Sequence, residues 1–162
     1  MKIEKYISGK YALNIHHPYK ADEPTGDWHG FIWDNIKELP NKNVTYAGNG
    51  FPINTFHVWN DFGIFDDTEY FKTRNILLKE NNVYIADYYR AILDMVYYHL
   101  ISFNNLLGLN CITYDHLDND NQVMIVLDNI QLLKKNIDKT KCLILDNWIE
   151  KEKNYEHYRK TG

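Results

Sequence analysis

The sequence VYIADYYRAILDMVYYHLI at residues 83–101 carries the clearest helical pattern of this 162-residue chain. Its apolar side chains recur at positions 85, 89, 92, 96 and 100, which share one face of a helix. Asp87, Arg90 and Asp94 gather on the opposite face. The pattern predicts an amphipathic helix that packs on another layer and keeps this polar face exposed.

Two further helices are predicted beyond this segment. The apolar residues of 121–137 form one stripe at helical spacing, and Asp118 or Asp120 is placed to cap its start. The range 141–160 shows a second stripe with Trp148 at its centre. Both stripes predict helices that bury one side.

Ile125 and Leu132 lie opposite the main stripe of the 121–137 helix. Their burial requires a second surface, which is either another helix of the same chain or a partner chain. Self-association is therefore one alternative, and a helix packed on both sides within its own fold is the other.

The first 66 residues are rich in turns, because they hold all four prolines and most of the glycines. Short strands are predicted at 10–15 and 28–33, and the ranges 55–59 and 62–65 suggest a hairpin or a bent strand pair. Turns therefore separate short strands throughout this part.

The range 68–80 is ambiguous between helix and strand. The order of the other elements predicts an α+β fold, with a small, mainly antiparallel sheet in the N-terminal part packed with about three C-terminal helices. No linker or repeat divides the chain, so a single domain over residues 1–162 is expected.

Composition and charge narrow the class of protein. The chain holds 18 lysines and arginines against 22 aspartates and glutamates, a formal net charge of −4, whereas a general nucleic-acid binder usually shows a basic field. The first five residues, MKIEK, mix charges, and no apolar run approaches the roughly 20 residues that span a bilayer. We expect a cytoplasmic protein without a membrane or nucleic-acid partner.

Histidines and carboxylates concentrate in the turn-rich part of the chain. Asp27 and His29 lie two residues apart on a predicted strand and so share a face, and His57 and Asp61 could join them from a neighbouring strand and its turn. Such a set would bind zinc or manganese and activate a water molecule. In the alternative interpretation, Asp27 closes the preceding turn and His29 is a half-buried hydrogen-bonding residue.

Four segments occur in order along the chain: GKYALN at 9–14, TGDWH at 25–29, FGI at 62–64 and YYRAILD at 88–94. Together they resemble a small bacterial family with the pattern GKYALN…GDWH…GI…RAxLD, associated with mobile-element and toxin–antitoxin gene neighbourhoods. The stretch 51–65 is longer before the Gly-Ile step than in that pattern. The resemblance implies an antitoxin-like or immunity-like partner role and carries over no catalytic residue.

The sequence favours a non-enzymatic protein, without a cofactor, that binds and neutralises a partner protein: an antitoxin, an immunity protein of bacterial defence or a phage-encoded inhibitor. The candidate contact residues share the predicted exposed side of the 83–101 helix, and they are Tyr84, Asp87, Arg90, Asp94, Tyr97 and Tyr98. Aromatic side chains around an arginine and two carboxylates suit an interface hot spot, and they also suit an ordinary solvated face. A metal-dependent hydrolase or nuclease is the alternative function.

Overall fold

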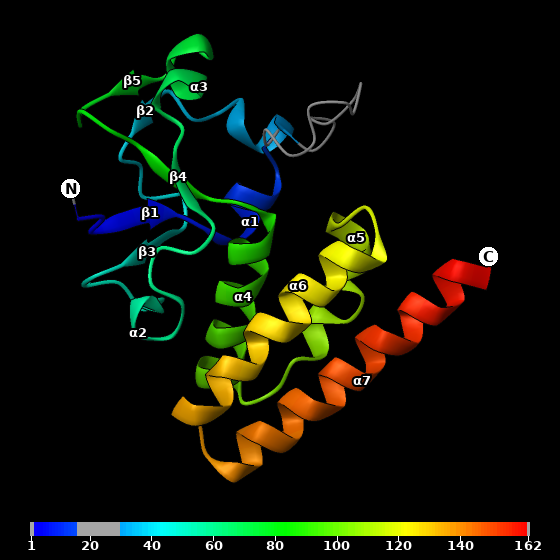
Figure 1. Ribbon diagram of the computed structural model, residues 1–162. Helices are drawn as coiled ribbons and strands as arrows, with labels where there is room; N and C mark the ends of the chain where they lie inside the picture. The colour runs from blue at the N-terminus through cyan, green and yellow to red at the C-terminus, as the bar shows by residue number, and fades with distance from the viewer. Residues whose placement is uncertain (1, 16–29, 162) are drawn as a thin grey trace.

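The computed structural model describes residues 2–15 and 30–161 of the chain (Figure 1). Strands gather at one end of the molecule, and the helices α6 (Asp120–Ile130) and α7 (Lys139–Thr161) lie at the other. Helix α4 (Tyr88–Phe103) runs between these two parts. The arrangement confirms the predicted α+β class.

Within the described residues, a four-stranded sheet forms the first layer. Its strands in spatial order are β3 (Tyr46–Gly48), β1 (Lys5–Ile7), β6 (Tyr84–Ala86) and β4 (Ile64–Asp66). Strand β1 pairs antiparallel with β3 and parallel with β6, so that Ile7 lies opposite both Tyr46 and Ile85. Strand β4 pairs antiparallel with β6. The sheet is therefore small and mainly antiparallel, as predicted.

Short elements fill the connections between the strands and the long helices. They are α1 (Gly9–Leu13), the 3-10 helix η2 (Gly30–Trp33), α2 (Phe56–Trp59), α3 (Thr68–Thr73), the 3-10 helix η3 (Leu107–Leu109), α5 (Ile112–His116) and the 3-10 helix η4 (Gln131–Asn136). A separate parallel pair joins β2 (Glu38–Leu39) to β5 (Leu77–Leu78). The ambiguous range 68–80 thus holds a helix followed by a strand.

The three predicted long helices are present as α4, α6 and α7. Asp87 caps α4, since its Oδ1 accepts the backbone N–H of Arg90 at 2.8 Å. Asn104 ends this helix in the left-handed conformation, with φ of 55°. Asn119 caps α6, in place of Asp118 or Asp120, by accepting the backbone N–H of Gln122 at 3.0 Å.

Two predicted strands are wrong, because the structure makes them short helices. The range 10–15 contains most of α1, which packs against α4, and the range 55–59 contains α2. Asn60 ends α2 with a positive φ of 49°, and the chain turns directly into β4. Strand β4 then pairs with β6, so the predicted hairpin does not form. In the range 28–33, residues 30–33 form η2 and the first two lie outside the described residues.

The start of the 83–101 stretch is also corrected. Residues Tyr84–Ala86 form β6 between β1 and β4, and the helix begins only at Tyr88. Ile85 is fully buried in the sheet. The helical spacing between Ile85 and Tyr89 is therefore a coincidence across the strand–helix boundary at Asp87.

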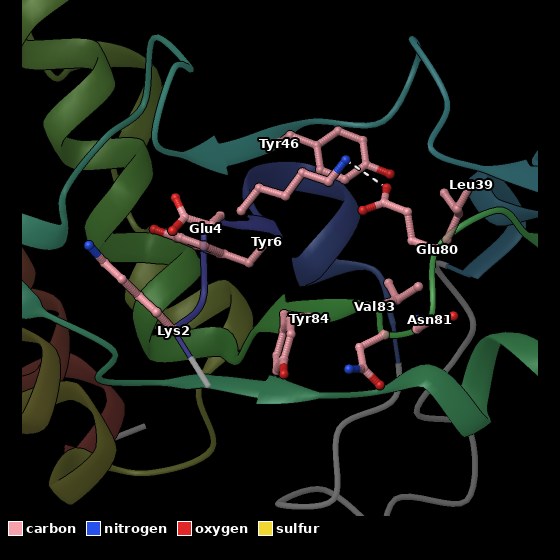
Figure 2. A pocket seen from close by; sticks show the side chains of 11 residues that line it. Lys2, Glu4, Tyr6, Leu39, Tyr46, Glu80, Asn81, Val83 and Tyr84 are labelled. Carbon is pink, nitrogen blue, oxygen red and sulfur yellow. Dashed lines mark ion pairs between the residues drawn. The ribbon is translucent and has the colours of Figure 1, made fainter.

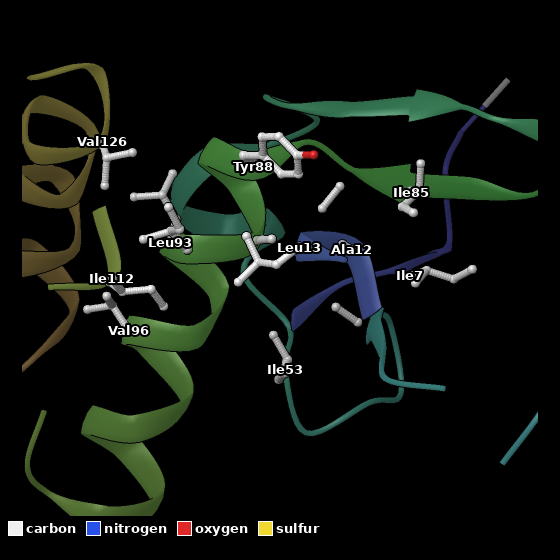
Figure 3. Packing of buried hydrophobic residues seen from close by; sticks show 14 of the residues in the cluster. Ile7, Ala12, Leu13, Ile53, Ile85, Tyr88, Leu93, Val96, Ile112 and Val126 are labelled. Atoms are coloured by element: carbon white, nitrogen blue, oxygen red, sulfur yellow. The ribbon is translucent and has the colours of Figure 1, made fainter. Parts of the chain in front are cut away.

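The hydrophobic core covers α4 on two sides (Figure 3). Leu93 and Val96 of α4 face Val126 of α6, while Leu13 of α1 and Ile85 of β6 lie on the opposite side. All five side chains are almost inaccessible to solvent. Burial on both sides means that the polar residues in the first half of α4 do not face solvent.

Ile125 and Leu132 remain partly exposed, at 38% and 42% of their surface. The interpretation in which another helix of the same chain buries them is wrong. Coverage by a partner chain or a second copy stays a prediction.

Candidate functional site

A buried polar group joins α4 to the sheet. We call it the Arg90 cluster, and its members are Tyr6, Ser8, Thr55, Asp87, Arg90 and Asp94. The Asp94 carboxylate accepts hydrogen bonds from the hydroxyls of Ser8 (2.7 Å), Tyr6 (2.8 Å) and Thr55 (2.6 Å). Its Oδ1 also lies 3.2 Å from Nε of Arg90. Tyr6 and Ser8 lie in and directly after β1, Thr55 precedes α2, and Arg90 lies one turn earlier in α4.

The Arg90 guanidinium uses its donors to hold the segment after α2. Its Nη1 donates to the carbonyls of Asn60 at 3.0 Å and Phe62 at 2.7 Å, and its Nη2 donates to Thr55 Oγ1 at 3.0 Å. The rings of Tyr6 and Trp59 lie 5.3 and 5.8 Å from the guanidinium carbon. These partners satisfy the buried guanidinium, and Arg90 thereby connects α4 to the segment after α2.

The glycine of the FGI segment fits closely against this cluster. Gly63 has φ of +71°, and a Cβ at this position would lie 2.6 Å from Asp87 Oδ1. Burial raises the pKa of the Asp87 carboxyl to about 6, against the lowering effects of Arg90, and burial also raises the pKa of the Tyr6 hydroxyl. The FGI and RAxLD segments therefore meet in one buried cluster. Packing and hydrogen bonding within the fold explain why these residue types occur there.

The prediction that the six contact residues share an exposed face is wrong for three of them. Arg90 and Asp94 are fully buried and Asp87 is nearly so. Tyr84, Tyr97 and Tyr98 are half-buried, and their contact with a partner stays a prediction. The signal that sequence reasoning undervalued is the i,i+4 pair of Arg90 and Asp94, because paired charges tolerate burial that single charges do not.

Of the four predicted metal ligands, two lie within the described residues and two lie outside them. Asp27 and His29 lie outside them, so neither the metal site nor the alternative turn is tested. His57 and Asp61 are exposed, on α2 and on the turn that follows it, and the His57 ring lies 6.3 Å from the ring of Tyr97. The described part of the chain brings together no three His, Cys, Asp or Glu side chains that could hold an ion.

A cavity of about 220 Å³ opens beside β1, β3 and β6 (Figure 2). Lys5 crosses it, forming an ion pair of 2.6 Å with Glu80 and lying 5.3 Å from the centre of the Tyr46 ring. Burial raises the pKa of the Tyr46 hydroxyl to about 12. Tyr84 lines the cavity as well. Among the described residues, the lining holds Lys2 and Lys5 against Glu4 and Glu80, so its formal charges balance and favour neither an anion nor a cation.

A larger groove of about 470 Å³ lies along α4, and we call it the α4 groove. Met95, Tyr98 and His99 of α4 form one wall, and the opposite side is formed by α1, the segment 42–46 and the segment 52–53. Burial lowers the pKa of His99 and so favours its neutral imidazole. The groove is therefore an apolar and aromatic channel with polar edges.

The end of α4 beside this groove presents apolar side chains to solvent. Ile101, Phe103 and Leu107 are 49%, 55% and 69% exposed. The Phe103 ring packs edge-on against Tyr98 at 5.7 Å and against His99 at 5.2 Å. A Cβ on Gly108 would lie 3.4 Å from His99, so η3 also rests on this ring. We call these residues, Tyr98, His99, Ile101, Phe103 and Leu107, the α4 tip.

Sequence reasoning missed the α4 tip and the groove. A usable signal is the run HLISFNNLLG at 99–108, in which apolar residues continue past the end of the amphipathic stripe and across a helix stop. The groove has no comparable signal, because its walls come from three separate segments.

Within residues 2–15 and 30–161, every helix is too short or too polar to cross a membrane. No family model matches the chain, and no curated protein and no solved structure shows significant similarity to it.

Proposed function

We propose that this protein binds a partner protein through the α4 tip and thereby neutralises it, in the manner of an antitoxin, an immunity protein or a phage-encoded inhibitor. The observation that supports the proposal most is the exposure of three large apolar side chains, Ile101 and Phe103 at the end of α4 and Leu107 in η3. All three lie within seven residues of the chain, and exposed apolar side chains that form a patch mark interaction surfaces in soluble proteins.

The α4 tip is also organised in advance of binding. Phe103 is held between the rings of Tyr98 and His99, and Asn104 fixes the end of the helix by donating its backbone N–H to the carbonyl of Leu100 at 3.1 Å. An aromatic anchor that is already ordered loses little conformational entropy on binding. This property suits tight inhibition by a small protein.

The test compares a tip variant with a matched control. The variant Ile101→Ser/Phe103→Ser removes two tip side chains, while Leu77→Ser changes a side chain that is 61% exposed on β5, outside the tip. Immobilised wild-type protein first captures a protein of the encoding organism that binds it reversibly. The dissociation constant of this partner is then measured with immobilised wild type and with each variant.

We expect the tip variant to bind at least about thirtyfold more weakly, which corresponds to roughly 2 kcal/mol for the loss of hot-spot side chains. Leu77→Ser should bind as wild type does. Circular dichroism melting must show that both variants remain folded. Equal dissociation constants for wild type and tip variant would contradict the proposal.

A further inference from the structure

The α4 groove differs in charge from the rest of the chain. Among the described residues, its lining includes Lys10, Lys42 and His99 and no aspartate or glutamate, although acidic residues outnumber basic ones in the whole sequence, 22 to 18. Both lysines are exposed. Within the described residues neither of them forms an ion pair, whereas Lys5, by contrast, pairs with Glu80. Within residues 2–15 and 30–161, no acidic side chain is paired with either lysine of the groove.

Much of the remaining lining is apolar or aromatic. Val44 and Ile53 are buried, Met95 is half-buried, and the Tyr98 ring stands at the junction with the α4 tip. The volume of about 470 Å³ lies within the range of roughly 300–1,000 Å³ that is usual for ligand sites. A segment that combines carboxylates with apolar side chains matches this lining.

The walls of the groove are held by hydrogen bonds that do not depend on a ligand. The backbone N–H of Ser8 donates to the carbonyl of Thr45 at 3.0 Å, and the N–H of Val44 donates to the carbonyl of Asn41 at 3.1 Å. The Asn41 side chain accepts the N–H of Asn43 at 2.9 Å. A preformed groove binds an extended segment at a small cost in ordering the protein.

From this charge and shape we propose that the α4 groove binds an extended acidic segment of the partner, with a carboxylate between Lys10 and Lys42 and an apolar side chain against Met95 and Ile53. The inference rests on the proposed function, because the groove and the α4 tip share Tyr98 and His99 and so form one surface. The overall charge of −4 does not oppose this binding, since exposed charges are screened beyond about 10 Å at 0.1 M salt.

The probe is a five-residue peptide, acetylated and amidated at its ends, with the sequence LEFEL. Its binding to the full ¹⁵N-labelled chain is followed by amide chemical shifts and compared with that of LQFQL and LKFKL. We expect LEFEL to shift the amides of Thr45, Tyr98 and His99 in a saturable manner. LQFQL should bind about tenfold more weakly, and LKFKL should give no saturable shift.

Two lysine variants locate the charge effect. Lys10→Gln/Lys42→Gln should weaken LEFEL binding about tenfold, while Lys72→Gln/Lys139→Gln makes the same change in net charge outside the groove and should leave it unchanged. Equal binding of LEFEL and LQFQL would overturn the inference. So would saturable shifts of the groove amides by an eight-residue oligothymidylate in the absence of LEFEL binding, which would indicate a nucleic-acid ligand.

The outcome separates this inference from the proposed function. The tip variant Ile101→Ser/Phe103→Ser should keep LEFEL binding, since neither side chain lines the groove. If the partner binds through the α4 tip and LEFEL fails to bind, the groove inference is wrong and the proposed function stands. If LEFEL binds and the tip variant retains the partner, the proposed function is wrong.

Discussion

Asp94 accepts hydrogen bonds from three hydroxyl groups and pairs with Arg90 in a site without solvent contact. We expect Asp94→Ala to lower the free energy of unfolding by about 3–5 kcal/mol, because the guanidinium stays buried without its carboxylate. Urea denaturation measures the difference. The control Asp128→Ala changes an exposed carboxylate on α6 and should stay within about 0.5 kcal/mol of wild type. A loss below about 1 kcal/mol for Asp94→Ala would contradict this account.

Asp87 should make stability depend on pH. Burial raises its pKa in the folded protein to about 6 from an unfolded value of 3.8, so the folded state binds more protons between these values. Stability from this group is therefore present below about pH 4 and is lost as the pH rises through 6. Asp87→Asn keeps a helix cap without the titration, and it should reduce the decline between pH 4 and 7 by on the order of 1–3 kcal/mol. Denaturation at a series of pH values, with an unchanged decline in the variant, would refute this assignment.

Gly63 and Gly50 offer a comparison of two glycines with positive φ. A Cβ on Gly63 would lie 2.6 Å from Asp87 Oδ1 and 2.8 Å from Arg90 Cβ, whereas a Cβ on Gly50 would meet nothing within 4 Å. We expect Gly50→Ala to cost only the backbone strain, about 1 kcal/mol, and Gly63→Ala to cost at least about 2 kcal/mol more. Thermal melting of both variants measures this. Equal losses would show that the contact with the Arg90 cluster is unimportant.

Among the elements, α7 depends on Trp148. This side chain is almost fully buried, and its Nε1 donates to the carbonyl of Leu109 at 3.1 Å, which joins α7 to η3. We expect Trp148→Ala to destabilise the protein by about 3–5 kcal/mol through the cavity and the lost hydrogen bond. The midpoint of denaturation gives the value. An unchanged midpoint would mean that α7 is peripheral to the cooperative unit.

Long elements could be predicted from the sequence and short ones could not. α4, α6 and α7 each run for three turns or more, so their apolar residues repeat often enough to reveal the period. α1 and α2 have five and four residues, and their conformation depends on contacts with distant segments. The residue pattern alone therefore favoured strands at both places.

The candidate site shows the same limit at the scale of the whole molecule. The Arg90–Asp94 pair lies within one helix, but its partner Tyr6 is 88 residues from Asp94 and Thr55 is 39 residues away. Periodicity reports one apolar face of α4, whereas the fold covers the helix from the sheet side and from the α6 side. The end of α4 remains exposed to solvent. Its exposure follows from the packing of the sheet and α6 around the rest of the helix, and it could not be predicted from the apolar periodicity of α4.

Neutralisation through the α4 tip can be measured as inhibition of the partner by the purified protein. The activity of the captured partner is measured while wild type, the tip variant Ile101→Ser/Phe103→Ser or the control Leu77→Ser is added. The account predicts that wild type and control abolish the activity at saturation, and that the tip variant leaves it intact at the same concentration. Full activity in the presence of saturating wild type, or equal inhibition by the tip variant, would contradict it.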